Sequence, residues 1–207
     1  MVCLPEVIHN SQIAMKNIVL FGAPGVGKGT HAGILAEKYD LLHLSTGDLL
    51  RGEVAQGTPL GLRVKASMER GDLVGDDVVI ALVDKALAST EQGIILDGFP
   101  RTVQQAQALD FLLRNHRRKL SCVISIDASR DELVRRIHER AVISGRTDDA
   151  DDNVIRHRLE EYDAKTKPVT DYYKVSGLLV SIDGSGEINQ TSMRLCKVVD
   201  MLLSGNV

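Results

Sequence analysis

The 207-residue sequence is poor in aromatic residues, in net charge and in long apolar stretches. Aromatic residues make up 3% of the chain and tryptophan is absent, so a surface for stacking nucleic-acid bases is poorly supplied. The formal net charge of −3 gives no general attraction to nucleic acid or to an anionic membrane. No apolar stretch approaches the roughly 18 residues of a transmembrane helix. We therefore expect no nucleic-acid partner and no membrane partner.

Cysteine is scarce as well, and recognisable targeting signals are missing. Cys3, Cys122 and Cys196 are far apart and form no CxxC pair, which favours reduced thiols over a disulfide framework or a zinc site. Residues 1–15 contain no lysine or arginine, so they lack the basic segment of a secretory signal and the arginines of a mitochondrial presequence. We expect a cytoplasmic protein in which residues 1–15 extend a core of residues 16–207.

Apolar segments typical of strands alternate with helical patterns in this core. Strands buried on both faces of a parallel sheet appear as short, continuous apolar runs. Such runs are Asn17–Phe21, Leu41–Leu44, Gly93–Asp97, Cys122–Asp127 and Leu178–Asp183. Helical patterns cover Gly29–Tyr39, Gly61–Glu69, Asp77–Ala88, Thr102–Leu113, Arg130–Arg140, Asp152–Lys165 and Gln190–Leu203. The alternation predicts a three-layer α/β fold, with a parallel sheet of about five strands between two layers of helices.

Two stretches interrupt this alternation. Residues 45–74 form a glycine-rich helical insertion, and residues 140–150 form a short polar loop. Both leave the core near the ends of strands or helices, where mobile lids are usually placed. Neither cysteine nor histidine occurs in the second stretch, so no structural zinc is expected there.

The strongest functional signal is a glycine-rich loop between the first predicted strand and the first predicted helix. It comprises Gly22, Ala23, Pro24, Gly25, Val26, Gly27, Lys28, Gly29 and Thr30. Glycines let the backbone approach phosphate oxygens, the helix N-terminus attracts the anion, and Lys28 can reach the β- and γ-phosphates. The loop therefore predicts a nucleotide site, although the hydroxyl of Thr30 follows the lysine one position later than in the general motif.

An aspartate at the end of an apolar strand predicts a magnesium site beside these phosphates. Asp97 closes one of the apolar runs, and a carboxylate there can order Mg²⁺ and its waters. The alternative is an aspartate that caps the turn before Pro100, but the phosphate loop favours the functional interpretation. Ser45 and Asp48 have the spacing of a helix capping box, which explains both residues without a ligand.

A set of arginines follows the fourth predicted strand. Arg136 and Arg140 are four residues apart and share a helix face, where two guanidinium groups repel each other unless an anion lies between them. The alternative is a solvated helix face with Glu132 and Glu139 as partners. Arg146 lies in the polar loop, and the three arginines together favour phosphate binding.

Four motifs occur in a fixed order: the glycine-rich loop, Ser45–Arg51, Asp97–Thr102 and Ser144–Asp149. Together they resemble the adenylate kinases among the nucleoside monophosphate kinases, from about residue 16 to the C-terminus. The resemblance implies a fold of the P-loop NTPase type and reversible, direct in-line phosphoryl transfer from MgATP to AMP, giving two ADP. It also implies that residues 45–74 are an AMP-binding subdomain, that residues 140–150 are a short lid and that the protein is a monomer.

The resemblance assigns roles on the donor side. Residues 22–30 would hold the ATP phosphates together with Arg136, while Arg140 and the backbone near Gly186 would frame the ATP base. Asp97 and Asp48 would order magnesium through waters, and Thr30 is a further candidate for the metal.

It also assigns roles on the acceptor side. The AMP site would comprise Thr46, Arg51, Asp72, Leu73, Val74, Gly98, Arg101, Gln105, Arg146 and Arg158. The residues acting on the transferring phosphoryl group would be Lys28, Arg101, Arg136, Arg146 and Arg158, none of them as a nucleophile. Asp148 and Asp149 would close the lid.

Two other functions stay open at this point. A UMP/CMP kinase shares the short lid and the arginines, but Thr46 and Gln105 favour AMP because a glutamine amide can pair with the adenine edge. A nucleotide-binding regulatory module without turnover would lack Lys28, Arg101 or Arg146, and all three are present.

Overall fold

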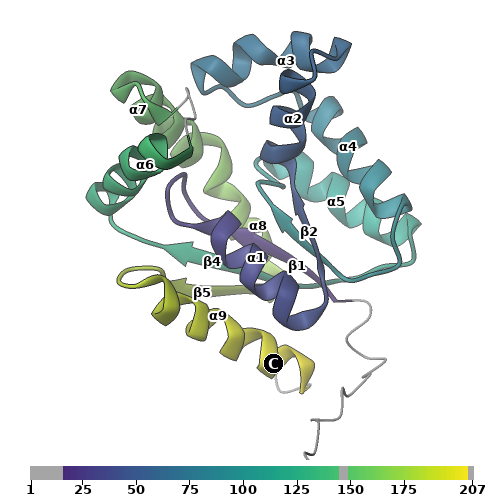
Figure 1. Cartoon of the computed structure of the whole chain (residues 1–207). Coiled ribbons are helices and arrows are strands. Elements are labelled where there is room, and N and C mark those ends of the chain that lie inside the picture. The colour runs from purple at the N-terminus through teal and green to yellow at the C-terminus, as the bar shows by residue number, and fades with distance from the viewer. Residues whose placement is uncertain (1–15, 145–148, 205–207) are drawn as a thin grey trace, which may run out of the picture.

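Five parallel strands form the central sheet of the computed structural model, which describes residues 16–144 and 149–204 (Figure 1). Across the sheet they are β2 (Leu42–Ser45), β3 (Ile94–Asp97), β1 (Asn17–Phe21), β4 (Leu120–Asp127) and β5 (Leu179–Asp183). The connection after β1 leads to β2 at one edge of the sheet, and the connection after β4 leads to β5 at the opposite edge. The carboxyl ends of β1 and β4 therefore flank a topological switch point, where ligands bind in such folds.

Helices cover both faces of the sheet. Ile18 and Leu20 of β1 point into one core cluster, whereas Val19 and Phe21 point into the other, as the period of two in a strand requires. The first cluster is shared with α1 (Lys28–Tyr39), α6 (Arg130–Ser144), α7 (Asp152–Glu161) and α9 (Ile188–Leu203). The second is shared with α4 (Asp76–Ala88), α5 (Val103–Asn115) and α8 (Pro168–Val175). The predicted three-layer α/β fold is confirmed.

Two further helices stand beyond the carboxyl ends of the strands. α2 (Thr46–Ala55) begins directly after β2, and the Ser45 hydroxyl accepts the Asp48 N–H at 3.2 Å, which confirms the predicted N-cap. α3 (Pro59–Arg70) packs so closely on α2 that a Cβ at Gly61 would lie 2.1 Å from the Glu53 carbonyl oxygen. In Figure 1, α2 and α3 lie across the strand ends from α6 and α7.

Helix α6 is longer than the sequence predicts. It continues to Ser144, so the first five residues of the stretch predicted as a polar loop, 140–144, are helical. Val142 and Ile143 in this last turn are 88% and 86% exposed. Because these apolar side chains do not face the core, the helical periodicity that marks an amphipathic helix stops at Arg140.

The helix predicted over Asp152–Lys165 is divided. α7 ends at Glu161 and a π-helical turn, η2 (Tyr162–Thr166), follows it. The short helix α8 is absent from the prediction because it buries only Val169 and Tyr173, too few residues to establish a period.

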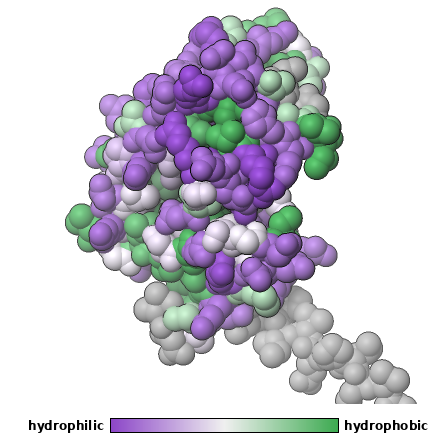
Figure 2. Space-filling view, turned by 90° about the vertical axis from the view of Figure 1, so that its left-hand side faces the viewer, coloured by the Kyte–Doolittle hydropathy of each residue, from purple (hydrophilic) through white to green (hydrophobic). Residues whose placement is uncertain are grey.

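The surface is predominantly polar on the side that lies at the left of Figure 1, as Figure 2 shows. Exposed apolar side chains such as Leu62, Phe111 and Val175 belong to separate helices. In the described part of the chain, no helix combines the length and the apolar character needed to span a bilayer.

Neighbouring tyrosines on α8 provide a matched test of the core. Tyr173 is 1% exposed and its hydroxyl bonds to no described residue, whereas the Tyr172 hydroxyl donates to Asp110 Oδ2 at 2.6 Å. Removing a bonded hydroxyl costs about 1 kcal/mol, but removing a buried unsatisfied one is neutral or favourable. We expect Tyr172→Phe to lower the free energy of unfolding in urea by about 1 kcal/mol and Tyr173→Phe to maintain or raise it. A larger loss for Tyr173→Phe than for Tyr172→Phe would contradict this prediction.

Candidate active site

Glycines shape the loop between β1 and α1. Gly22, Gly25 and Gly27 have φ angles of +143°, +86° and +95°, which residues with a Cβ rarely adopt. Helix α1 starts at Lys28, and its N-cap residue, Gly27, has no side chain that could cap the first N–H groups. These donors and the positive end of the helix dipole therefore face the loop, as an anion site requires.

Lys28 folds back onto this loop. Its ammonium group donates to the carbonyl oxygens of Gly22 at 2.7 Å and Ala23 at 3.1 Å. Burial lowers the pKa of Lys28 from 10.5 to about 8, with Asp97 opposing this shift and nearby arginines adding to it. Phosphate oxygens in place of the two carbonyls would stabilise the charged form of Lys28.

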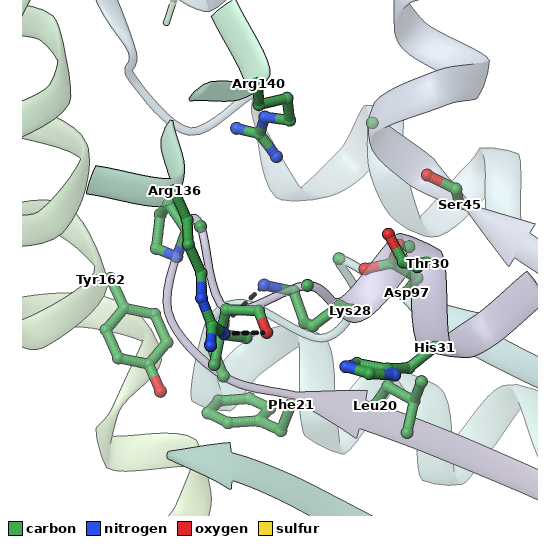
Figure 3. A pocket seen from close by; sticks show the side chains of 18 of the residues that line it. Leu20, Phe21, Lys28, Thr30, His31, Ser45, Asp97, Arg136, Arg140 and Tyr162 are labelled. Carbon is green, nitrogen blue, oxygen red and sulfur yellow. Dashed lines mark hydrogen bonds between the residues drawn. The ribbon is translucent and has the colours of Figure 1, made fainter. Parts of the chain in front are cut away.

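A cavity of about 760 Å³ opens around the loop at the carboxyl ends of the strands (Figure 3). All residues of the predicted phosphate loop except Ala23 line it. Its basic lining residues are Lys28, Arg51, Arg101, Arg135, Arg136, Arg140 and Arg158. Five carboxylate residues line it as well, so the seven lysine and arginine residues leave an excess of positive charge in a chain whose net charge is −3, and this excess attracts polyphosphates.

Asp97 ends β3 at this cavity and lies near Lys28 in Figure 3. It is 8% exposed, and its Oδ2 atom lies 3.5 Å from Nε2 of His43 on β2. Burial opposes ionisation, but His43, Lys28 and Arg101 outweigh it and hold the pKa of Asp97 below its ordinary value. The carboxylate is therefore ionised at neutral pH, the form that binds magnesium or its waters.

The other residues predicted for the metal differ in their surroundings. Thr30 lines the same cavity as Asp97. Asp48 lines it too, but its side chain is 55% exposed and accepts a hydrogen bond from Arg51 Nη2 at 2.5 Å. Asp97 and Thr30 are therefore the oxygen donors that best fit a hydrated magnesium ion.

Asp149 joins two arginines from different helices. It is fully buried, and its carboxylate accepts hydrogen bonds from Arg140 Nε at 2.6 Å, Arg140 Nη2 at 2.9 Å and Arg158 Nη1 at 2.6 Å. Burial opposes ionisation here as well, but the two guanidinium groups hold the pKa of Asp149 below its ordinary value. Asp149 thus gathers one arginine of α6 and one of α7 at the wall of the cavity.

Two of the arginines of α6, Arg136 and Arg140, lie in different environments. Arg136 donates to the carbonyl oxygens of Gly184 and Gly186, each at 3.1 Å. Burial, and after it the charge of Arg136, lowers the pKa of His31. Arg140, by contrast, is one of the charges that lower the pKa of Lys28. The contacts of the two arginines thus differ, with Arg136 beside the Gly186 backbone and Arg140 beside Asp149, and the division of roles between them stays a prediction.

A second cavity of about 70 Å³ adjoins the first and shares Arg51, Arg101 and Arg158 with it. Its lining includes Thr46, Arg51, Asp72, Leu73, Val74, Gly98, Arg101, Gln105 and Arg158. All described residues that the sequence predicts for the AMP site therefore lie around one cavity. Arg146 and Asp148 lie outside the described residues.

Backbone and side-chain hydrogen bonds organise this second cavity. The Gly98 carbonyl oxygen accepts from Thr46 Oγ1 at 2.9 Å and from Arg101 Nε at 2.8 Å. Gln105 is 1% exposed, and its Oε1 atom accepts the Arg101 backbone N–H at 2.7 Å, while the Thr102 side chain accepts the Gln105 N–H at 3.1 Å. The Gln105 side chain therefore binds the backbone just before α5 and lines the cavity at once, and its pairing with adenine stays a prediction.

The prediction omits several residues that contact the site residues, among them His43 and Asp76. His43 lies two positions before Ser45 in β2. Because side chains in a strand alternate between its two faces, the sequence already indicated that His43 shares a face with Ser45. Asp76 accepts a hydrogen bond from Gln105 Nε2 at 2.7 Å, across 29 positions of sequence. No local pattern indicates such a long-range contact.

Comparison with known proteins places the chain in a family. The family model described as "Adenylate kinase" matches residues 20–178. The chain belongs to the adenylate kinase family. It is 47% identical to the adenylate kinase of Thermus thermophilus (86% of this chain and 94% of the relative). It is 42% identical to that of Leptospira biflexa (89% and 100%) and 41% identical to that of Chloroherpeton thalassium (88% and 97%).

The lowered pKa of Lys28 predicts an alkaline limit to nucleotide binding in this adenylate kinase family member. As the pH rises through about 8, the ammonium group of the unliganded protein loses its proton. We therefore expect kcat/KM for ATP, which reports groups of the free enzyme, to fall above that pH. Bound phosphate favours the charged form, so kcat should hold to higher pH.

Steady-state kinetics from neutral to alkaline pH checks this prediction, with Lys28→Arg as the control. The guanidinium group of the variant stays protonated, so its residual kcat/KM should not fall in this range. The same alkaline fall in Lys28→Arg would assign the titration to another group.

Proposed function

We propose that this chain reversibly transfers the terminal phosphoryl group of MgATP to AMP and so forms two molecules of ADP. The observation that carries the proposal is the pair of adjoining cavities, one around the phosphate loop and one lined by the predicted AMP residues. Nucleotides in the two cavities would direct their phosphates toward the shared residues Arg101 and Arg158. Membership of the adenylate kinase family supports the same activity.

The reaction is a direct in-line transfer. An oxygen of the AMP phosphate forms a bond to the γ-phosphorus while the bond from that phosphorus to the β–γ bridging oxygen breaks, and ADP leaves with the electron pair. Phosphoryl transfer depends mainly on positioning and on charge stabilisation. The cations around the cavity meet this need without a covalent intermediate on the protein.

On the donor side, Lys28 would exchange the carbonyl oxygens of its own loop for oxygens of the β- and γ-phosphates. Magnesium, when bound, neutralises charge on these phosphates. Asp97 and Thr30 would hold the ion through its waters. Arg136 would lie over the base, near Gly186.

At the point of transfer, Arg101, Arg140 and Arg158 would surround the phosphoryl group. Asp149 would position two of these guanidinium groups through its three hydrogen bonds. A fixed guanidinium group loses less conformational freedom when it binds phosphate than a freely rotating one does.

Closure over both nucleotides would exclude water as a competing acceptor. Residues 45–74 would act as the AMP-binding subdomain and residues 140–150 as the short lid, with Arg146 added to the phosphate site on closure. Asp148 and Asp149 would close the lid. A monomeric state and a cytoplasmic location stay predictions.

The function is tested by a coupled assay of MgATP consumption with AMP, UMP, CMP and GMP as acceptors. We expect turnover with AMP and much less with the other three. Lys28→Met should lower kcat by about 10²–10³, the usual effect of removing one donor to a developing charge. Turnover with UMP or CMP instead would overturn the AMP site. Inactivity with all four acceptors, in folded protein that still binds ATP, would instead indicate a regulatory module.

The division of roles between Arg136 and Arg140 of α6 has its own test. Arg136→Ala should raise KM for ATP and leave kcat nearly unchanged, because a base contact is equally strong in the ground state and the transition state. Arg140→Ala should lower kcat about 10²-fold or more, because it removes a charge from the transferring group. The opposite pattern in steady-state kinetics would restore the division predicted from the sequence.

A further inference from the structure

Hydrogen bonds on both sides fix the orientation of the Gln105 amide. Its Nε2 atom donates to Asp76 Oδ1 at 2.7 Å, and its Oε1 atom accepts the Arg101 backbone N–H at 2.7 Å. A carboxylate only accepts hydrogen bonds and a backbone N–H only donates them. Rotation of the amide by 180° would therefore place two acceptors together on one side and two donors together on the other.

The groups that hold the amide are themselves held. Asp76 lies in the first turn of α4, where the helix dipole stabilises a negative charge, and its Oδ2 atom accepts from Thr102 Oγ1 at 2.9 Å. Thr102 also caps α5 by accepting the Gln105 backbone N–H. The amide is thus bound to the starts of two helices, and little freedom is left to it.

The held amide can still recognise a ligand. A carboxamide has two N–H donors and an oxygen with two lone pairs, and the protein uses one of each here. The described residues leave one N–H and one lone pair of the amide, in a fixed order, on a side chain that lines the smaller cavity.

We propose that Asp76 is a positioning residue that sets the base selectivity of the acceptor site, by preventing rotation of the Gln105 amide. This inference rests on the proposed AMP site. Adenine presents an amino group next to a ring nitrogen, which matches one acceptor and one donor in a fixed order. Guanine and uracil carry a carbonyl oxygen where adenine carries its amino group, so the amide oxygen would face another acceptor. Cytosine also carries an amino group, so this device does not act against CMP.

The test compares AMP with inosine monophosphate, which has the same size but an oxygen in place of the amino group. In Asp76→Asn the new side chain can present either an acceptor or a donor, so the Gln105 amide gains freedom to rotate. We expect the ratio of kcat/KM for AMP to that for inosine monophosphate to fall about tenfold, the effect of about one hydrogen bond. The change should lie in KM, with kcat for AMP nearly unchanged.

Asp77→Asn is the matched control, because it removes the same charge from the same turn of α4 at an exposed position. Its selectivity ratio should equal that of the parent protein. If KM rises equally for both acceptors in Asp76→Asn, Asp76 has a structural role alone and the proposal is overturned. Should Asp76→Asn not fold, as judged by circular dichroism, Asp76→Ser removes the same carboxylate and is judged by the same ratio.

Gln105→Leu separates this inference from the function on which it rests. An unchanged KM for AMP in Gln105→Leu would show that Gln105 does not contact the base, and would overturn the assignment of Gln105 to the AMP site. A changed ratio in Gln105→Leu, together with an unchanged ratio in Asp76→Asn, would keep that assignment and overturn the role of Asp76.

Discussion

Repulsion among cations gathered at the strand ends is the constraint on which the site depends. Burial and the charges of Arg101, Arg140 and Arg158 all lower the pKa of Lys28. Charges removed from water are costly unless they are paired. Asp97 offsets part of this cost from β3, but the excess of positive charge at the cavity remains. A bound polyphosphate supplies the missing negative charge, so the same repulsion that destabilises the empty site strengthens the binding of its ligand.

The fold supplies what this arrangement needs, because parallel strands bring distant segments to one edge. Lys28 follows β1, Asp97 ends β3, and the helix that carries Arg136 and Arg140 follows β4. Asp149 then ties Arg140 to Arg158 of α7, so that two helices present their charges together. Each of these strands and helices contributes one or two charged side chains, and the sheet fixes the distances between them.

Local patterns in the sequence were enough to predict the strands, the phosphate loop and the aspartate at the end of β3. They were not enough to predict contacts between residues that lie far apart in the sequence. Nothing near Arg136 indicates its bonds to Gly184 and Gly186, about fifty positions away, so spacing along α6 could not separate its role from that of Arg140. The last turn of α6 was not predicted because its apolar residues Val142 and Ile143 are exposed and so do not continue the amphipathic pattern. Hydrophobic periodicity indicates which residues are buried. The hydrogen bonds of Arg136 and the last turn of α6 do not depend on buried apolar residues, so periodicity does not indicate them.

Gln105 shows that a structural role and a functional role need not compete. The Thr102 side chain caps the start of α5, and the Gln105 side chain accepts the N–H of Arg101, the residue before this cap, so both residues have structural roles without any ligand. An amide that could turn freely would fit either order of donor and acceptor on a base, and would therefore distinguish bases poorly. The hydrogen bonds of the amide to Asp76 and to the Arg101 N–H remove this freedom. In the proposed AMP site, base selectivity would thus depend on hydrogen bonds that also join the starts of α4 and α5.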